Sequence, residues 1–348
     1  MGARAMAAIL SLLPRRWRIV YAAVLAAKLA ALFLVIPHAK QIYPYMNVDT
    51  FPDHYEKLAW NLAEGNGYRF FPDTAPTMAR TPGYPLLLAP LFAVFGQSLA
   101  AAKILNLLLS LLAAMLIADF GGRVLGSPAV SRLAPLIFLL HPAVILAESR
   151  GGPEVFLCFL FVLALSLMQR AARKQTWGAF LSAGLAVGAG ALVKSTFLVL
   201  PAALLAARPA SGSPWRRFLP RWALLCAAVL AVQSPWIWRN ARVSGAFVPT
   251  MTVAGMSATQ GMHICRNASL TDPLSPENYT GRGMNEGAYE ALELAQRWGY
   301  EVKGDYFLFF ESSADEVACN RRLLDRVAGI YLDRPLLVLK CLIVNLFN

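Results

Sequence analysis

The chain has 348 residues, of which 57% are hydrophobic and 15% are charged, and its formal net charge is +12. Soluble domains carry about a quarter charged residues and under half apolar ones, so this composition excludes an ordinary cytosolic enzyme. It also excludes a disordered chain, a collagen-like chain and a small disulfide scaffold. The basic residues flank apolar runs, which indicates the cytoplasmic loops of a membrane protein rather than nucleic-acid binding.

Seven apolar segments approach the length of about 20 residues that a membrane-spanning helix needs. They cover residues 19–37, 98–118, 133–147, 154–168, 177–193, 195–207 and 222–236. An eighth begins at Leu336, and because 13 residues remain from there to Asn348 we expect a span that is cut short. The segment 84–95 contains Pro85 and Pro90, which favours an interfacial or half-inserted helix. The sequence therefore predicts an all-α polytopic membrane protein.

Lysine and arginine in the connections between these spans predict their orientation. One set of connections is rich in basic residues and should be cytoplasmic, together with the N-terminus: Arg4, Arg15, Arg16, Arg18, Arg123, Arg132, Arg170, Arg173, Lys174, Arg208, Arg216, Arg217 and Arg221. The alternate set faces the other side. We expect a transmembrane bundle at 1–238 that includes a first extracytoplasmic loop at 38–97, an extracytoplasmic region at 239–335, and the start of a further span at 336–348.

The two long outer segments show helical patterns of their own. In the first, Tyr55, Leu58 and Leu62 recur at helical spacing, with Thr50 as a candidate N-cap and Gly65 as a stop. Such a helix would lie on the membrane surface. In the second, we expect helices at 286–298 and 314–332.

The cysteines provide one specific expectation about the outer segments. Cys265 and Cys319 are the only two cysteines predicted to face an oxidising compartment, so a disulfide between them is one candidate cross-link. The other cysteines fall within predicted spans. The four histidines show no spacing typical of a metal site, and no phosphate-binding glycine loop or dinucleotide motif is present, so we expect neither metal nor cofactor.

Acidic residues at the predicted outer face are candidates for acid–base chemistry. Asp53 begins the surface helix and could act as a general base, but Thr50 and Asp53 also have the spacing of a capping box. Asp49 is the alternative base. Glu154 begins a span, where a carboxylate either favours the helix N-terminus or orients a sugar hydroxyl, and Arg150 flanks it across a Gly-Gly-Pro turn.

Three basic residues fall on the same predicted outer face, against the positive-inside trend. Arg80 lies in the rigid turn Arg-Thr-Pro-Gly-Tyr-Pro, Lys194 interrupts a long apolar stretch, and Arg239 follows Ser-Pro-Trp-Ile-Trp. Each could merely extend to the interface, as long cationic side chains do. Together they predict an anionic ligand at the outer face, such as a lipid phosphate.

The runs Asp53-His-Tyr-Glu-Lys-Leu-Ala-Trp-Asn-Leu-Ala and Arg80-Thr-Pro-Gly-Tyr-Pro-Leu-Leu-Leu-Ala resemble the bacterial branch of the dolichyl-phosphate-mannose protein mannosyltransferase family. That family belongs to the GT-C superfamily and includes the lipid A aminoarabinose transferases. Later stretches agree, namely Arg150-Gly-Gly-Pro-Glu, residues 184–194, and Ser234-Pro-Trp-Ile-Trp-Arg-Asn.

The resemblance implies an integral membrane glycosyltransferase in the bacterial inner membrane, active on the extracytoplasmic face. It would take a sugar from a polyprenyl-phosphate carrier and deliver it, with inversion, to an acceptor that is a lipid, a glycan or a protein. By the same resemblance Asp53 corresponds to the base, Arg80, Lys194 and Arg239 to phosphate ligands, and Tyr55 and Tyr84 to residues that bind or orient sugar or acceptor. Relatives often have arginine at the position of Lys194. A transporter or flippase of a lipid-linked sugar is the alternative function, and a membrane scaffold without catalysis is a third.

Overall fold

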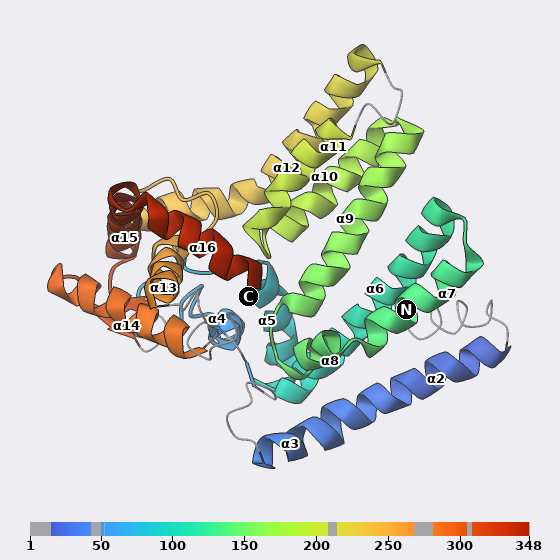
Figure 1. Cartoon of the computed structure of the whole chain (residues 1–348), viewed down its shortest axis with the longest axis horizontal. Helices are drawn as coiled ribbons and strands as arrows, with labels where there is room; N and C mark the ends of the chain where they lie inside the picture. The colour runs from blue at the N-terminus through green and yellow to red at the C-terminus, as the bar shows by residue number, and fades with distance from the viewer. Residues whose placement is uncertain are drawn as a thin grey trace. The chain divides into compact units, whose positions relative to one another are not determined.

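The described part of the protein is almost entirely helical, as predicted, and contains one short β-hairpin. The computed structural model describes residues 15–42, 50–51, 53–207, 214–267, 281–304 and 308–347 (Figure 1). Asp49 lies outside the described residues. Within the described chain the structure confirms an all-α protein with several apolar helices of membrane-spanning length.

Four of the described helical segments are long and apolar enough to cross a membrane. They are Ile19–Gln41, Leu99–Val124, Glu154–Lys174 and Trp215–Ser244. A fifth candidate is the pair α7 (Pro128–Leu140) and α8 (Pro142–Ser149), which are bent by 51° relative to each other. The bend arises at His141 because Pro142 cannot donate a backbone hydrogen bond, and the His141 imidazole instead accepts from the amide of Ala143.

Two of the seven predicted spans are shorter helices. α10 (Trp177–Ala191) has 15 residues, and the 3₁₀ segment η2 (Ser195–Val199) continues into α11 (Leu200–Ala206). Fifteen residues of helix extend about 22 Å, less than the hydrocarbon core of about 30 Å. The span predicted from hydropathy at 177–193 therefore extends two residues beyond the end of α10 at Ala191.

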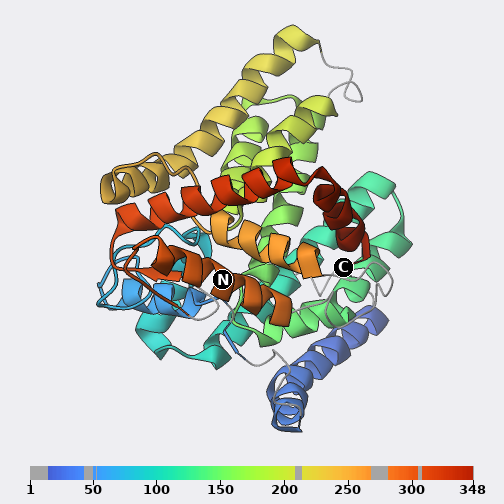
Figure 2. The ribbon, with the colours of Figure 1, turned by 60° about the vertical axis from the view of Figure 1, so that its left-hand side comes forward.

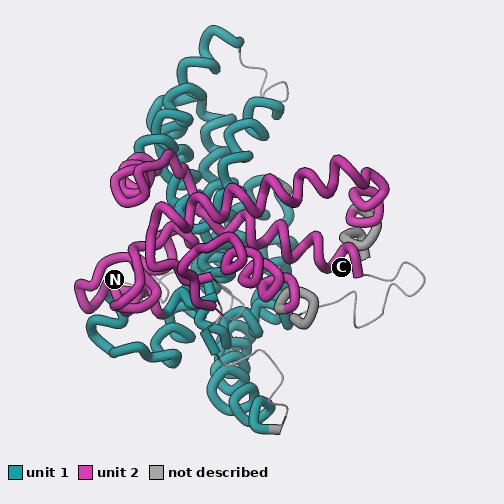
Figure 3. Tube along the Cα trace, turned by 90° about the vertical axis from the view of Figure 1, so that its left-hand side faces the viewer, with its two compact units in different colours: residues 1–56, 90–232 teal, residues 57–89, 233–348 magenta. Residues whose placement is uncertain are grey.

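The chain forms two compact units, which are coloured separately in Figure 3. Unit 1 comprises residues 1–56 and 90–232, and unit 2 comprises residues 57–89 and 233–348. Part of the predicted first outer loop therefore packs with the C-terminal third of the chain. Which segments face which side of the membrane stays a prediction.

Unit 1 is built from α2 (Arg15–Ala30), η1 (Ala31–Val35), α3 (Ile36–Ile42), α6 (Leu99–Leu125), the helices α7 to α11, and the first part of α12 (Trp215–Ser244). In it, α6 packs against both α7 and α9 (Glu154–Lys174). A buried ion pair joins Lys28 of α2 to Glu148 of α8, with 2.8 Å between Nζ and Oε1, and the same ammonium donates to the carbonyl of Leu139. Charges inside a membrane helix bundle are tolerated when they are paired in this way.

Unit 2 holds most of α4 (Tyr55–Ala63), the start of α5 (Gly83–Phe95), the end of α12, and the helices α13 (Ala254–Asn267), α14 (Gly281–Arg297), α15 (Ser313–Asp333) and α16 (Pro335–Phe347). α13 packs against both α14 and α15 (Figure 2). The close approach of α13 to α15 needs glycine at position 255, because a Cβ there would lie 2.4 Å from the carbonyl oxygen of Asn320. Strand β1 (Val302–Gly304) pairs antiparallel with β2 (Leu308–Phe310), and Val302 lies opposite Phe310.

The predicted helices of the outer segments are largely confirmed. The expected helices at 286–298 and 314–332 correspond to α14 and α15. The first-loop helix ends before Gly65, which has a φ of +79° and so needs a glycine. It begins only at Tyr55, however, rather than directly after Thr50.

The predicted disulfide between Cys265 and Cys319 is wrong in its second partner. The structure joins Cys265 of α13 to Cys341 of α16, with the two Cα atoms 5.1 Å apart, and leaves Cys319 as a buried free thiol. Cys341 lies in an apolar stretch that predicts a membrane span, and this pattern does not indicate a disulfide partner. The turn at Arg334 brings α16 back onto α13, and this chain reversal has no signal in the hydropathy pattern.

Candidate functional site

The first-loop acid Asp53 has an unusual backbone conformation. Its φ is +61° and that of His54 is +59°, so two consecutive residues other than glycine occupy the left-handed region. Aspartate tolerates this region better than most residues, but such a conformation persists only where the surroundings impose it, as they often do at functional sites. Because α4 begins two residues later, at Tyr55, the capping-box interpretation of Thr50 and Asp53 is wrong.

The segment before Asp53 is attached to the turn between α8 and α9, all within unit 1. The amide of Gly151 donates to the carbonyl of Thr50 at 2.9 Å. The ring of Phe51 packs directly on Gly151, where a Cβ would lie 2.0 Å from its Cδ1 atom, and meets the ring of Phe92 edge-on at 5.8 Å. We call this contact of residues 50–51 with Gly151 the Phe51 latch.

The turn that contacts Phe51 is itself held by hydrogen bonds from α6. The side-chain amide of Asn106, on α6, donates to the carbonyls of Arg150 at 3.0 Å and Gly152 at 3.4 Å. Glu148, one turn earlier on α8, forms the ion pair with Lys28. These contacts hold the backbone of the turn to which residues 50–51, just before Asp53, are attached.

Arg150 and Glu154 bring polar atoms into this partly buried turn. Among the described residues, Nε of Arg150 and Oε2 of Glu154 are buried without a hydrogen-bond partner. Glu154 is the first residue of α9, where a carboxylate is favoured by the helix dipole. The turn therefore offers a buried N–H group and a buried carboxylate oxygen that a polar ligand could satisfy. Lys194, also in unit 1, is exposed where α10 gives way to η2.

In unit 2, two of the three predicted phosphate ligands lie around Tyr68. The Tyr68 hydroxyl donates to the carbonyls of Arg80 and Thr81, at 3.0 Å each. The guanidinium of Arg239 donates through Nη2 to the Tyr68 carbonyl at 3.2 Å, and its centre lies 5.5 Å from the Tyr68 ring. Trp236 packs edge-on against the same ring. Arg80 and Arg239, 159 positions apart in the chain, thus both contact one buried tyrosine, Arg80 through its backbone carbonyl and Arg239 through its guanidinium.

Arg239 is held rigidly while keeping part of its hydrogen-bonding capacity. Its Nη1 donates to the Thr77 carbonyl at 2.7 Å and to the side-chain oxygen of Asn240 at 3.2 Å, in addition to the bond from Nη2 to Tyr68. These three bonds use three of the five N–H groups of a guanidinium. A fixed arginine with two remaining donors can grip an oxyanion without further ordering cost.

Behind these residues lies a buried acid that sequence reasoning missed. Glu316, on α15, accepts from the Thr77 hydroxyl at 2.8 Å and the Met78 amide at 2.9 Å, and also from the Thr252 hydroxyl. Burial raises the pKa of the Glu316 carboxyl above its ordinary value, even though these hydrogen bonds and Arg239 oppose the shift. Glu316 thereby fixes the segment that leads into Arg80.

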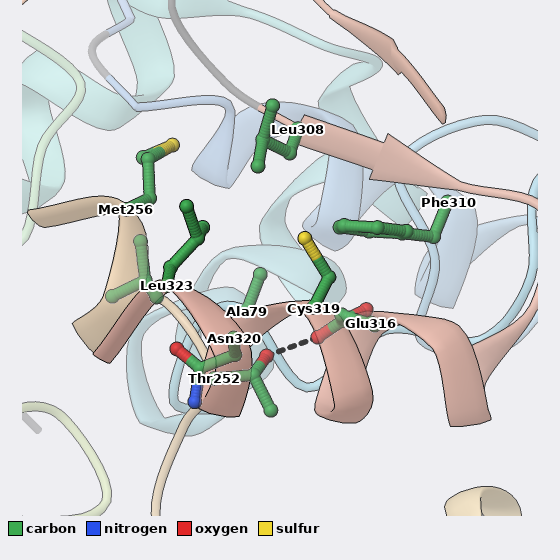
Figure 4. A pocket seen from close by; sticks show the side chains of 10 residues that line it. Ala79, Thr252, Met256, Leu308, Phe310, Glu316, Cys319, Asn320 and Leu323 are labelled. Atoms are coloured by element: carbon green, nitrogen blue, oxygen red, sulfur yellow. Dashed lines mark hydrogen bonds between the residues drawn. The ribbon is translucent and has the colours of Figure 1, made fainter. Parts of the chain in front are cut away.

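A small cavity of about 20 Å³ adjoins Glu316, with room for roughly one water molecule. It is mostly apolar, and Figure 4 shows Cys319 and Phe310 on its wall beside the hydrogen bond from Thr252 to Glu316. The cavity is too small for a sugar. A sequence signal for Glu316 existed, because it shares one face of α15 with the buried residues Cys319, Leu323 and Val327 at spacings of three and four.

The two tyrosines predicted to bind or orient sugar or acceptor are both buried. Tyr84 is fully buried at the start of α5, and Tyr55 is buried at the start of α4. No three His, Cys, Asp or Glu side chains in the described part of the chain could together hold a metal ion. The structure thus links Asp53 to the turn carrying Arg150 and Glu154 in unit 1, and Arg80 to Arg239 in unit 2.

These features define a polytopic membrane protein in which the guanidinium of Arg239 is held by three hydrogen bonds. Residues 79–238 match the family model described as dolichyl-phosphate-mannose-protein mannosyltransferase. The matched segment contains Arg80, Arg150, Glu154 and Lys194 and ends immediately before Arg239.

The curated relatives that match this chain are also mannosyltransferases by name. The chain is 32% identical over 172 residues to GPI alpha-1,6-mannosyltransferase 2 of Mus musculus, and 31% identical over 172 residues to the protein of the same name from Cricetulus griseus. Each match covers 44% of this chain and 33% of the relative, so the matched part spans about a third of the length of these relatives. No solved structure is a significant match.

Proposed function

We propose that the protein is an inverting glycosyltransferase that transfers mannose from a polyprenyl-phosphate carrier to an acceptor outside the cytoplasm. The observation that carries this proposal is that Tyr68 contacts both the backbone of Arg80 and the guanidinium of Arg239, in a chain whose residues 79–238 match a family named for a dolichyl-phosphate sugar donor. The names of the curated relatives support mannose as the sugar. Acceptor class stays open among lipid, glycan and protein.

In the proposed reaction the acceptor hydroxyl attacks the anomeric carbon opposite to the phosphate. Asp53 takes the hydroxyl proton, the new acceptor–carbon bond forms, and the bond from the anomeric carbon to the phosphate oxygen breaks. The electron pair leaves with polyprenyl phosphate, which needs no proton donor. In-line attack inverts the anomeric configuration.

The cations contribute by stabilising charge that develops on the leaving phosphate. Arg80, Lys194 and Arg239 are proposed to bind this group, and preorganised donors at a site poor in water are worth more than mobile ones. Glu154 and Arg150 are proposed to orient the sugar or the acceptor, because their buried polar atoms lie in the turn that receives the Phe51 latch. The distribution of basic residues supports an extracytoplasmic site, and the sequence resemblance supports a bacterial inner membrane.

An assay with purified protein tests the function. The protein is reconstituted in vesicles with radiolabelled polyprenyl-phosphate mannose and a membrane extract as the acceptor source. The proposal predicts release of polyprenyl phosphate together with labelled acceptor. A flippase would move the intact donor between leaflets without releasing polyprenyl phosphate, and that result would overturn the proposal.

A further inference from the structure

Unit 1 contains an apolar groove that the proposed reaction does not use. It has a volume of about 250 Å³ and is lined entirely by apolar residues from three helices: Ile117, Phe120 and Gly121 of α6, Val130 and Ala134 of α7, and Val162 and Leu165 of α9. A groove of this size without polar groups does not hold ordered water, so a hydrocarbon chain is the occupant that its surface favours.

The wall of the groove between α6 and α7 is closely packed. A Cβ on Gly121 would lie 3.2 Å from Cγ1 of Val130, so the two helices are in close contact there. The hydroxyl of Ser131 also donates to the carbonyl of Ala118 at 2.8 Å. Because this contact fixes the two helices against each other, the groove is a formed site rather than a gap that side chains would close.

A cluster of charges lies at one end of the groove. Arg123 of α6 and Arg170 of α9 both reach Asp119, with Arg170 Nη2 at 3.7 Å from Oδ2 of the carboxylate. Two arginines against one carboxylate leave a net positive charge, and Arg132 of α7 adds another on the adjoining helix. The side chains of Arg123 and Arg170 are 31% and 48% exposed, so an anion from outside the protein can reach them.

The arginines lie close enough to the apolar groove for one lipid molecule to contact both, with its acyl chain in the groove and its headgroup at the arginines. Arg123 follows Gly121 by two residues and Arg170 follows Leu165 by five, which are rises of about 3 Å and 7.5 Å along their helices. We infer that this groove is a binding site for an anionic phospholipid, with one acyl chain between α6, α7 and α9 and the phosphate against Arg123 and Arg170.

This site is separate from the proposed catalytic residues of unit 1. Glu154 and Arg170 lie at opposite ends of α9, 16 residues apart, a distance of about 24 Å along the helix. The cations proposed for the sugar donor are Arg80, Lys194 and Arg239. The groove therefore binds a lipid of the surrounding membrane and not the donor.

Native mass spectrometry of the full chain tests this inference, with phosphatidylglycerol and phosphatidylcholine of identical acyl chains as probes. We expect one tightly bound phosphatidylglycerol and at least tenfold weaker binding of phosphatidylcholine. The double variant Arg123→Gln/Arg170→Gln should reduce this preference to threefold or less. The matched variant Arg173→Gln, which removes an exposed charge from the same helix, should leave the preference unchanged.

Filling the groove tests the chain-binding half of the site. Ala134→Trp should weaken binding of both lipids about tenfold, whereas Leu133→Trp, at an exposed neighbouring position, should not. Equal binding of the two lipids by the unmodified protein would overturn the inference, and so would equal effects of the two tryptophan variants. If Ala134→Trp does not fold, the arginine variants still decide the outcome.

Discussion

Phe51 packs against Gly151 so closely that any side chain at Gly151 would collide with its ring. Phe51 is two residues from Asp53, and Gly151 lies in the turn between Arg150 and Glu154. Through this contact the conformation of the proposed base depends on a glycine nearly a hundred residues away in the sequence.

Replacing this glycine should impair catalysis more than folding. In Gly151→Ala the Phe51 ring has to move, and Asp53 moves with it, so we expect at least a tenfold loss of kcat, since misplacement of a catalytic group by about 1 Å costs up to about a hundredfold. Turnover and thermal unfolding are measured in parallel. Gly178→Ala is the control, because a Cβ there meets nothing within 4 Å. Equal activity of the two variants would contradict the role of the Phe51 latch.

Arg239→Lys should weaken donor binding. Lysine cannot reproduce the bonds from Nη1 and Nη2 to Thr77 and Tyr68 while also gripping a phosphate, so we expect KM for the donor to rise about tenfold or more with a smaller change in kcat. Arg242→Lys is the matched control. Arg242 lies three residues after Arg239 on α12, is exposed, and stacks on the ring of Trp238. An unchanged KM in Arg239→Lys would remove Arg239 from the phosphate site.

Glu316→Gln should alter the pH dependence of stability. The pKa of Glu316 is raised in the folded protein, so above the ordinary glutamate value of 4.5 the folded state holds this proton more tightly than the unfolded state does. Stability contributed by this group is therefore present at low pH and is lost as pH rises through the folded pKa. Glutamine removes the titration and keeps hydrogen bonds to Thr77 and Thr252, whose hydroxyls can accept as well as donate.

The measurement for Glu316 is the unfolding temperature as a function of pH. As pH rises above 4.5, the unfolding temperature of the unmodified protein should fall relative to that of Glu316→Gln. The expected fall is about 2–4 °C for each kcal/mol lost from the free energy of unfolding. Glu311→Gln, on an exposed carboxylate that pairs with Lys303, should follow the unmodified protein. Parallel curves for the unmodified protein and Glu316→Gln would show that Glu316 does not titrate abnormally.

Peptide mapping without reduction should recover Cys265 linked to Cys341. Cys319 should react slowly with iodoacetamide in the folded protein, because burial raises its pKa to about 12 and the thiolate is the reactive form. Denaturation should make Cys319 reactive at once. A peptide that links Cys265 to Cys319 would contradict the arrangement of α13, α15 and α16.

The fold class was predictable because its signals are local. Apolar length identified five of the spans, and the helix expected at 314–332 corresponds to α15. The tertiary relationships were not predictable. Nothing in the sequence shows that Phe51 packs on Gly151, that Tyr68 anchors both Arg80 and Arg239, or that α16 returns to α13.

The candidate residues were identified by residue type and expected side of the membrane, and those criteria cannot assign roles. Asp53 had the spacing of a helix cap, and only its left-handed backbone before Tyr55 removes that interpretation. Glu316 was overlooked because an acid in a long polar segment is normally solvated, whereas here it is buried against Thr77 and Thr252.

Asp53→Asn tests most directly whether Asp53 is the base of a sugar transfer. Asparagine is uncharged yet also tolerates the left-handed conformation of this position, so the variant removes the base without straining the loop. Release of polyprenyl phosphate from polyprenyl-phosphate mannose is measured beside donor affinity. We predict a loss of turnover of about 10²–10⁴-fold with unchanged donor affinity and unfolding temperature. Turnover within a factor of about three of the unmodified protein would contradict the account.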